Sequence, residues 1–205
     1  MTSEFDHKAR EWDNNPLHVE RSEAIAVSMI ELFPDKKLKK GLEFGAGTGL
    51  LSFLIKDHFE SIILADSSPE MIKVLTEKIN ERQVKNMHPV LIEPHEEIPG
   101  SGYNMVFTQM VLHHVTDTDR ILDDFYRVLK TGGQLAIADL YTEDGTFHSE
   151  PFAGHNGFDP AILAKSLAAR GFNDLHYQTC YKVNKILQNG LQKQFPIFLL
   201  TGKKS

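Results

Sequence analysis

The segment that most constrains this chain is GLEFGAGTGLLS at residues 41–52, in which an apolar run ends at a carboxylate and glycine then occupies every second position. Glycine at 45, 47 and 49 lets the backbone adopt positive φ and approach a ligand closely. The apolar residues from Leu50 to Ile55 are typical of a helix packed on a sheet. A strand, a glycine turn and a helix together point backbone N–H groups at a bound ligand. The sequence therefore predicts a cofactor site in the N-terminal third of the chain.

A second feature is needed, because many strand–helix turns carry glycine for their geometry alone. Residues 61–66, SIILAD, form a short apolar run that ends at Asp66. In nucleotide-binding α/β folds an acidic residue roughly 20 residues after the glycine turn meets the ribose hydroxyls. The pair of features predicts that the cofactor contains an adenosine moiety.

The spacing GxGxG after the acidic Glu43 resembles the cofactor loop of class I S-adenosylmethionine-dependent methyltransferases. Residues 103–139, YNMVFTQMVLHHVTDTDRILDDFYRVLKTGGQLAIAD, resemble the fourth strand, following helix, glycine turn and fifth strand of the same family. The resembling stretches run from Glu43 to Asp139. The resemblance implies a Rossmann-like, doubly wound α/β fold with a seven-stranded sheet, mostly parallel and ending in an antiparallel hairpin. It also implies S-adenosylmethionine as the cofactor and S-adenosylhomocysteine as its product.

Apolar periodicity and turn residues predict the elements. Helices are expected over residues 4–12, 17–33, 50–59 and 160–169 and after Ser68 and Thr116, and strands near 40–45, 61–66, 90–92, 105–107, 135–140, 175–186 and 192–201. Ser68 followed by Pro69 predicts an N-cap and a first helical position. Thr116 with Asp119 has the form of a capping box. Asn189–Gly190 favours a hairpin turn.

The length of 205 residues fits one domain. Within it we expect N-terminal cap helices over 1–38, a cofactor-binding core over 39–140, and an acceptor loop with the C-terminal hairpin over 141–205. The single Cys180 excludes an internal disulfide framework, and no charged-then-apolar leader opens the sequence, so a cytoplasmic location is expected.

Composition limits the partners. No run approaches the ~20 apolar residues that span a bilayer. A formal charge of −6 disfavours a sequence-independent grip on nucleic acid. We therefore expect a small-molecule acceptor, with neither nucleic acid nor membrane as partner, while the oligomeric state is not indicated.

The resemblance implies roles for individual cofactor residues. Glu43 is expected to receive the ammonium of the cofactor, the alternative being that it satisfies loop N–H groups. Asp66 is expected to accept both ribose hydroxyls, and its alternative role as an N-cap is weakened because Ser68 lies closer to the helix. The remaining contacts are the backbone of Gly45, Ala46 and Gly47 beside the amino-acid part, Ser67 and Met71 flanking adenine, and Gln109 and Met110 beside the cofactor. Met71 also falls on an apolar helical stripe, so a core role stays open.

After the third strand the local sequence IEPHEEIP departs from the common family pattern. Glu93, His95 and Glu96 are the alternatives for the adenine amino group, and the backbone N–H of His95 is expected to read the adenine ring. Asn104 replaces the aspartate usual before the fourth strand, which we interpret as a surface or turn change.

Four histidines follow strands on the side of the sheet where ligands gather in open α/β folds, namely His113, His114, His148 and His155. Packing or loop hydrogen bonding is expected for His113 and His114, with at most one of them facing the cleft. His155 is the leading candidate for a substrate contact or general base, with Tyr141 behind it. No HExxH motif or cysteine partner stands at ligand spacing, so no metal site is expected.

The N-terminal segment resembles the entry helix of small-molecule methyltransferases. Phe5, Trp12 and Arg21 are then pocket-lining residues, the alternative being an amphipathic helix anchored by one aromatic. The acceptor pocket is expected between this segment and the 141–158 loop, which carries Tyr141, His148, Phe152 and His155.

These features favour an enzyme that methylates a small molecule by in-line displacement. A nicotinamide-dependent oxidoreductase is disfavoured, because GxGxxG is absent and the sheet ends in a hairpin. A catalytically silent S-adenosylmethionine-binding regulator or partner subunit is left open, since methyl transfer requires little besides positioning.

Overall fold

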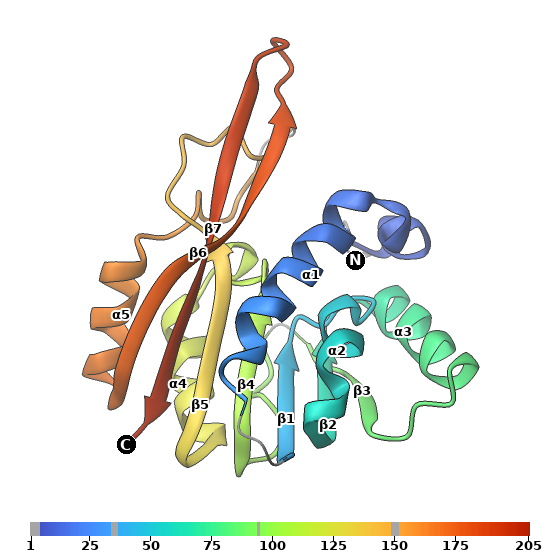
Figure 1. Ribbon diagram of the computed structural model, residues 1–205, viewed down its shortest axis with the longest axis vertical. Helices are drawn as coiled ribbons and strands as arrows, with labels where there is room; N and C mark the ends of the chain where they lie inside the picture. The colour runs from blue at the N-terminus through green and yellow to red at the C-terminus, as the bar shows by residue number, and fades with distance from the viewer. Residues whose placement is uncertain (1–4, 34–36, 94, 149–151) are drawn as a thin grey trace.

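The computed structural model describes residues 5–33, 37–93, 95–148 and 152–205, and a seven-stranded sheet forms its centre (Figure 1). The strands are β1 Leu38–Phe44, β2 Phe59–Asp66, β3 Met87–Leu91, β4 Tyr103–Gln109, β5 Leu129–Leu140, β6 Phe172–Ile186 and β7 Gln192–Lys204. Their order is β3-β2-β1-β4-β5-β7-β6, with β1 to β5 parallel and β7 antiparallel to both of its neighbours. This confirms the predicted Rossmann-like sheet.

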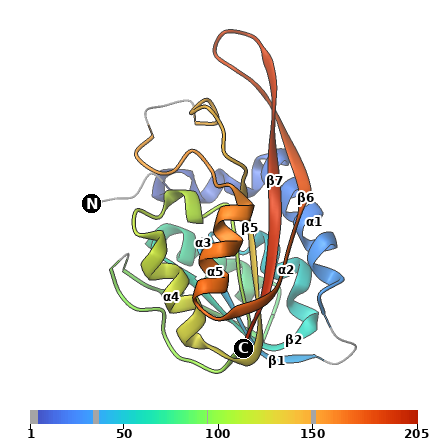
Figure 2. The same cartoon turned by 90° about the vertical axis from the view of Figure 1, so that its left-hand side faces the viewer.

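Helices cover both faces of the sheet (Figures 1 and 2). They are α1 Pro16–Ile30, α2 Leu50–Ile55, α3 Pro69–Glu81, α4 Thr118–Val128 and α5 Pro160–Ala169, with 3₁₀ helices η1 Asp6–Asn14, η2 Lys56–His58 and η3 Leu112–His114. Alternate residues of β4 point to opposite faces, so Met105 and Phe107 pack with α1, α2 and α3, whereas Val106 packs with α4 and α5. The two apolar layers hold the strand ends in place.

The helix starts test the capping predictions. The Ser68 hydroxyl accepts the Met71 N–H and Pro69 opens α3, as predicted. The prediction of Thr116 as a cap is wrong, because the Asp117 carboxylate accepts the Arg120 N–H and α4 begins after it. The helix expected over 4–12 starts at a residue outside the described ranges, and the described part is the 3₁₀ helix η1.

The C-terminal hairpin is longer than the rest of the sheet. Its strands pair out to Ile186 and Gln192, and Gly190 takes a φ of 81° in the turn predicted there. Because β5 pairs with β7 only between Gln134↔Lys203 and Leu140↔Ile197, the outer part of the hairpin stands above the sheet (Figure 1).

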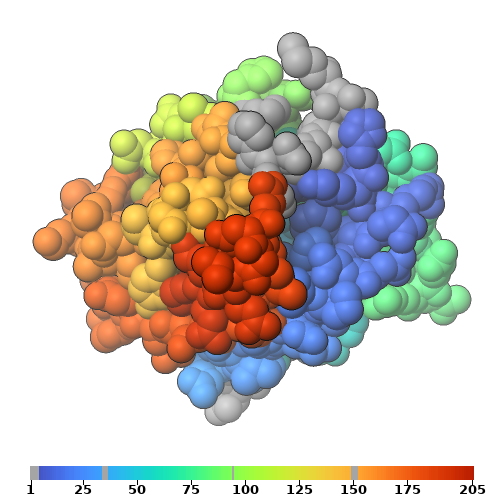
Figure 3. Space-filling view, turned by 90° about the horizontal axis from the view of Figure 1, so that it is seen from above, coloured from blue at the N-terminus to red at the C-terminus, as the bar shows by residue number. Residues whose placement is uncertain are grey.

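The carboxyl ends of the parallel strands form the edge on which the site is built. The N-terminal segment lies over this edge, and seen from above it lies directly beside the hairpin (Figure 3). The Tyr181 hydroxyl of β6 donates a hydrogen bond to the Glu20 carboxylate of α1 at 3.2 Å, which joins the two. No helix among the described residues is long and apolar enough to cross a membrane.

Candidate active site

The glycine turn joins β1 to α2, and its backbone requires glycine. Gly45, Gly47 and Gly49 have φ of 71°, 53° and 81°, a region that L side chains rarely adopt. A side chain at position 45 would also overlap Val111. The turn therefore leaves its backbone bare beside the cavity, which Gly45, Ala46 and Gly47 all line.

Asp66 ends β2 and lies against this turn. Its Oδ2 accepts the Gly47 N–H at 2.7 Å and its Oδ1 accepts the Ser68 N–H at 2.8 Å, while the side chain lines the cavity. Burial raises the pKa of Asp66 above its usual range, and the backbone N–H groups oppose that rise. The alternative of a helix cap is removed, because Ser68 caps α3.

Glu43 lies deeper, on β1, and is not among the residues that line the cavity. Its side chain is buried, its Oε2 accepts the Ser52 hydroxyl, and its Oε1 has no hydrogen-bond partner in the part of the chain that the structure describes. Burial raises the pKa of Glu43 to about 8, and the Ser52 hydrogen bond opposes this. The carboxyl group is therefore poised to gain stabilisation from a nearby cation.

The other predicted cofactor residues line the same cavity. They are Ser67 and Met71 after β2, Glu93, His95 and Glu96 after β3, and Gln109 and Met110 at the end of β4. Met110 has a φ of 55°, and its N–H donates to the Ala138 carbonyl, so the backbone of β4 turns sharply there. Gln109 Nε2 donates to the Ser22 hydroxyl at 2.9 Å, and its buried Oε1 has no partner among the described residues.

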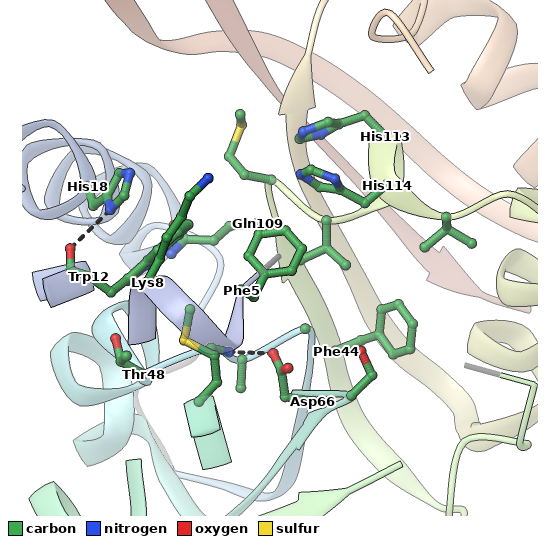
Figure 4. Close-up of a pocket in the computed structure, with 18 of the residues that line it drawn as sticks. Phe5, Lys8, Trp12, His18, Phe44, Thr48, Asp66, Gln109, His113 and His114 are labelled. Atoms are coloured by element: carbon green, nitrogen blue, oxygen red, sulfur yellow. Dashed lines mark hydrogen bonds between the residues drawn. The ribbon is translucent and has the colours of Figure 1, made fainter. Parts of the chain in front are cut away.

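The cavity has a volume of about 1010 Å³ and continues past these residues to a second end lined by histidine and aromatic side chains. Figure 4 shows Asp66 at one end and the rings of His113 and His114 at the other. Ligand pockets usually measure about 300–1,000 Å³, so the cavity is large enough to hold a second molecule beside a cofactor.

The N-terminal segment forms the roof of the cavity. Phe5, Trp12 and Arg21 line it, as predicted, together with Lys8 and His18. Aspartates of η1 fasten the roof to the cofactor end: Asp6 accepts the Ser68 hydroxyl, and Asp13 accepts the Thr48 hydroxyl and pairs with the Lys78 ammonium. These contacts join residues that are distant in the sequence.

Arg21 is the buried cation of the roof. The residue is only 8% exposed, and its guanidinium makes no hydrogen bond or ion pair in the described structure. Burial lowers the pKa of Arg21 to about 10, and the Asp139 charge opposes this. A buried charge without a close partner is costly, so this group is suited to an anionic ligand.

The structure pairs His113 with Asp139. The His113 Nδ1 lies 2.6 Å from the Asp139 Oδ1, and both side chains are buried. The sequence places His113 after the fourth strand and Asp139 at the end of the fifth, but nothing in its spacing indicates that they meet. Their pairing follows from β4 and β5 being neighbours in the sheet.

Tyr141 and His155, the predicted catalytic residues, do not line the cavity. The Tyr141 hydroxyl accepts a hydrogen bond from Thr179, and its ring packs on Phe198. His155 Nε2 lies 3.0 Å from the Val115 carbonyl oxygen, and the His155 N–H donates to the His113 carbonyl at 2.7 Å. Of the loop residues expected at the acceptor pocket, His148 and Phe152 reach it, together with Phe147.

Comparison with known proteins gives the family. The model of the methyltransferase domain family matches residues 42–137. An uncharacterized methyltransferase of Schizosaccharomyces pombe is 27% identical over 139 residues, which cover 60% of this chain and 49% of that protein. An arsenite methyltransferase of Halobacterium salinarum is 29% identical over 131 residues, covering 62% of this chain and 32% of that protein. This chain therefore spans about half or less of the length of these relatives.

Solved structures show the same fold. A complex of the Haloferax volcanii Trm112 methyltransferase activator with a methyltransferase matches with a TM-score of 0.79 at 14% identity, covering 99% of this chain and 98% of that chain. An S-adenosylmethionine-dependent methyltransferase from Aquifex aeolicus matches with a TM-score of 0.70 at 18% identity, covering 98% of both chains. The family match over residues 42–137 and the shared fold together support a class I S-adenosylmethionine-dependent methyltransferase, with S-adenosylmethionine as the cofactor.

Proposed function

We propose that this protein transfers the methyl group of S-adenosylmethionine to a small-molecule acceptor. The observation that carries the proposal is the continuous cavity, which joins the glycine turn and Asp66 to a separate end lined by Arg21, His113 and aromatic side chains. One ligand at each end would place donor and acceptor side by side. The catalytically silent regulator is not favoured, because such a protein needs no second ligand end.

In this proposal the cofactor end is divided among the residues predicted from the sequence. Asp66 accepts the ribose hydroxyls, and the backbone of Gly45, Ala46 and Gly47 lies against the amino-acid part. Glu43 receives the ammonium, directly or through water. Ser67, Met71 and His95 surround adenine, with Gln109 and Met110 beside the reacting end. The unpartnered Oε atoms of Glu43 and Gln109 support this arrangement, since both are buried polar atoms that a ligand would satisfy.

The cofactor supplies an activated methyl group on a sulfonium, with a thioether as the leaving group. The protein then has to align the acceptor with that methyl group and exclude water. The roof formed by Phe5 and Trp12 covers the cavity, and Asp13 holds it to Thr48 and Lys78. His155 has a positioning role in this proposal, because its two hydrogen bonds hold the His113–Val115 segment at the acceptor end.

Arg21 supports a carboxylate or phosphate as one of the bound groups. Lys185 on β6 also lines this end, and burial lowers the pKa of Lys185. The anion would come either from the carboxylate of the cofactor or from the acceptor. The two sources of the anion can be distinguished with 5′-methylthioadenosine, which lacks the amino-acid part of S-adenosylhomocysteine and therefore its carboxylate.

The test compares Arg21→Met with Arg82→Met, in which an exposed arginine of similar size is lost. A cofactor role predicts that Arg21→Met weakens S-adenosylhomocysteine binding at least tenfold and leaves 5′-methylthioadenosine binding unchanged. An acceptor role predicts unchanged binding of both and lost transfer to anionic acceptors. Unchanged binding together with unchanged transfer would contradict an anion at Arg21.

The transfer itself is tested with methyl-labelled S-adenosylmethionine and a panel of small phenols, thiols and amines, each with and without a carboxylate or phosphate. We expect label in at least one product, with S-adenosylhomocysteine formed in equal amount. Tight cofactor binding without transfer to any member of a broad panel would favour the silent subunit.

The negative formal charge supports an acceptor other than nucleic acid. The free thiol of Cys180 supports the proposed cytoplasmic location, where cysteines remain reduced. The solved complex with the Trm112 activator concerns the Haloferax protein, and no partner chain is assigned to the present protein on that basis.

A further inference from the structure

Three histidines meet at the acceptor end of the cavity. His113 and His114 come from η3, directly after β4, and His148 comes from the loop that follows β5. One ring nitrogen of each lies within 4.8 Å of the others. The rings of His113 and His114 lie one above the other on the same wall (Figure 4), with ring centroids 4.2 Å apart. Each of these two rings lies 5.4 Å from the ring of His148.

Asp139 fixes the tautomer of the His113 imidazole. The Asp139 carboxylate accepts hydrogen bonds from the backbone N–H groups of His113 and Leu140 as well as facing the His113 Nδ1. Because a carboxylate only accepts, the Nδ1 atom carries the hydrogen. The lone pair of the imidazole is then on Nε2, which is buried and has no hydrogen-bond partner among the described residues. A carboxylate behind a histidine is the usual support of a metal-ligating imidazole.

We propose that His113, His114 and His148 bind one divalent transition-metal ion of the zinc type, with a further coordination position open to the cavity. Three imidazole ligands and an open position are a common arrangement for zinc. Nitrogen ligands disfavour Mg²⁺ and Ca²⁺, which require oxygen donors. Imidazoles bind Zn²⁺, Co²⁺ or Cu²⁺ through nitrogen lone pairs.

Metal binding requires the three histidine side chains to move closer together. Zn–N bonds of about 2.0–2.1 Å place the ligand nitrogens of a tetrahedral site roughly 3.4 Å apart. The ligand nitrogens, which lie within 4.8 Å of one another, must therefore approach by up to about 1.4 Å. His113 is held by Asp139, whereas His114 and His148 are only partly buried, so the approach falls to these two side chains. Phe152 stacks on His148 with ring centroids 3.7 Å apart, and Phe147 packs edge-on against it, which gives the site an apolar rim.

The sequence alone does not indicate this site, because its ligands form no known metal motif. Two ligands are adjacent in one turn and the third comes from a distant loop. The open position faces the end of the cavity at which the acceptor is proposed to bind. A metal there would bind and acidify a hydroxyl or thiol of the acceptor. This role rests on the proposed function, whereas metal binding by the three histidines does not.

The test uses the full chain purified without a polyhistidine tag and stripped with a chelator. Titration with Co²⁺ should give visible absorption bands of an imidazole-bound ion, saturating at one equivalent. Zn²⁺ should displace the Co²⁺. We expect His148→Ala to weaken binding at least tenfold, and His176→Ala, which removes an exposed histidine of β6, to leave it unchanged.

Two further measurements separate metal binding from loss of fold and from methyl transfer. Zn²⁺ should raise the thermal midpoint of the wild type and of His176→Ala but not that of His148→Ala, whose circular dichroism spectrum should be native. Asp139→Asn should lower metal affinity about 10–100-fold. Absent Co²⁺ bands, or equal binding by folded His148→Ala and wild type, would overturn the site. Neither result depends on cofactor binding or on turnover, so the proposed function would be unaffected.

Discussion

Asp66 holds the glycine turn, and we propose that the same carboxylate binds the ribose hydroxyls. It accepts N–H groups from Gly47 and Ser68, so it fixes the glycine turn of β1 relative to the start of α3. The same side chain lines the cavity at the position expected for ribose hydroxyls. These protein hydrogen bonds fix the turn without a contribution from a ligand, which in our proposal reduces the ordering required on cofactor binding.

We predict that Asp66→Ala weakens S-adenosylhomocysteine binding by about 1.5–3 kcal/mol, the range for hydrogen bonds to a charged group. The free energy of unfolding should fall as well, because two backbone N–H groups lose their acceptor. Calorimetry measures the binding, and Asp57→Ala, which removes an exposed carboxylate, is the control. Normal affinity in a folded Asp66→Ala variant would show that the ribose partner lies elsewhere.

Glu43 makes stability depend on pH. Its pKa of about 8 in the folded protein lies above the ordinary value of 4.5, so the folded state keeps a proton that the unfolded state releases. Stability from this group is present below pH 4.5 and is lost as pH rises toward 8. At about 1.4 kcal/mol per unit of pKa, the change amounts to a few kcal/mol.

We therefore predict that Glu43→Gln flattens the decline of unfolding free energy between pH 5 and 8. Urea unfolding at several pH values, compared with the exposed Glu60→Gln, isolates the contribution of this group. Parallel pH profiles for Glu43→Gln and wild type would mean that Glu43 is ionised in the folded protein.

Most residues predicted for the cofactor end line the cavity, because their positions depend on local structure. The glycine turn, Asp66 and the residues after each strand stand at fixed short distances from elements that the sequence shows clearly. The acceptor end was predicted less well. His155 and Tyr141 belong to the expected loop but do not line the cavity. They form hydrogen bonds with Val115 and Thr179, which are tertiary contacts that no spacing reveals.

At the scale of elements, the N-terminal segment covers the cavity without being part of the sheet. It contacts the rest of the cofactor end through Asp6 and Asp13 of η1. Both aspartates bind residues of the cofactor end, so the roof is joined to the glycine turn through Thr48 and to α3 through Ser68 and Lys78.

We predict that Asp13→Ala weakens S-adenosylhomocysteine binding by about 1–2 kcal/mol and exposes η1 to protease, because the Lys78 ion pair and the Thr48 hydrogen bond are both lost. Limited proteolysis with and without ligand provides the measurement. Glu11→Ala, which removes a carboxylate of the same segment, should behave as wild type. Equal resistance of η1 to protease in Asp13→Ala and wild type would show that packing alone holds the roof in place.

Element boundaries show where sequence signals suffice. The Ser68–Pro69 start of α3 and the Pro160–Ala169 helix were predicted correctly, because caps and prolines act within a few residues. The start of α4 was displaced, since Thr116 and Asp117 are both plausible caps and the structure uses the carboxylate. The 3₁₀ helix has 3.0 residues per turn, which a segment of 9 residues does not distinguish from the 3.6 of an α-helix, so η1 was predicted as α-helical.

For the whole molecule, the parallel part of the sheet follows from the alternation of strands and helices, and its antiparallel edge follows from the hairpin at the end. The sheet brings β4 and β5 together, which places His113 against Asp139 and lets the loop after β5 bring His148 to the same place. We propose that the three regions expected from the sequence act as one domain, since the sheet includes strands from the central and C-terminal regions, and the N-terminal region covers its edge.

The most direct measurement is titration calorimetry of the full chain with S-adenosylhomocysteine, followed by the same titration with NAD. The geometry predicts one site per chain with micromolar affinity for S-adenosylhomocysteine, the same site competed for by S-adenosylmethionine, and no heat from NAD. Heat from NAD together with no response to S-adenosylhomocysteine would contradict the assignment of the cavity.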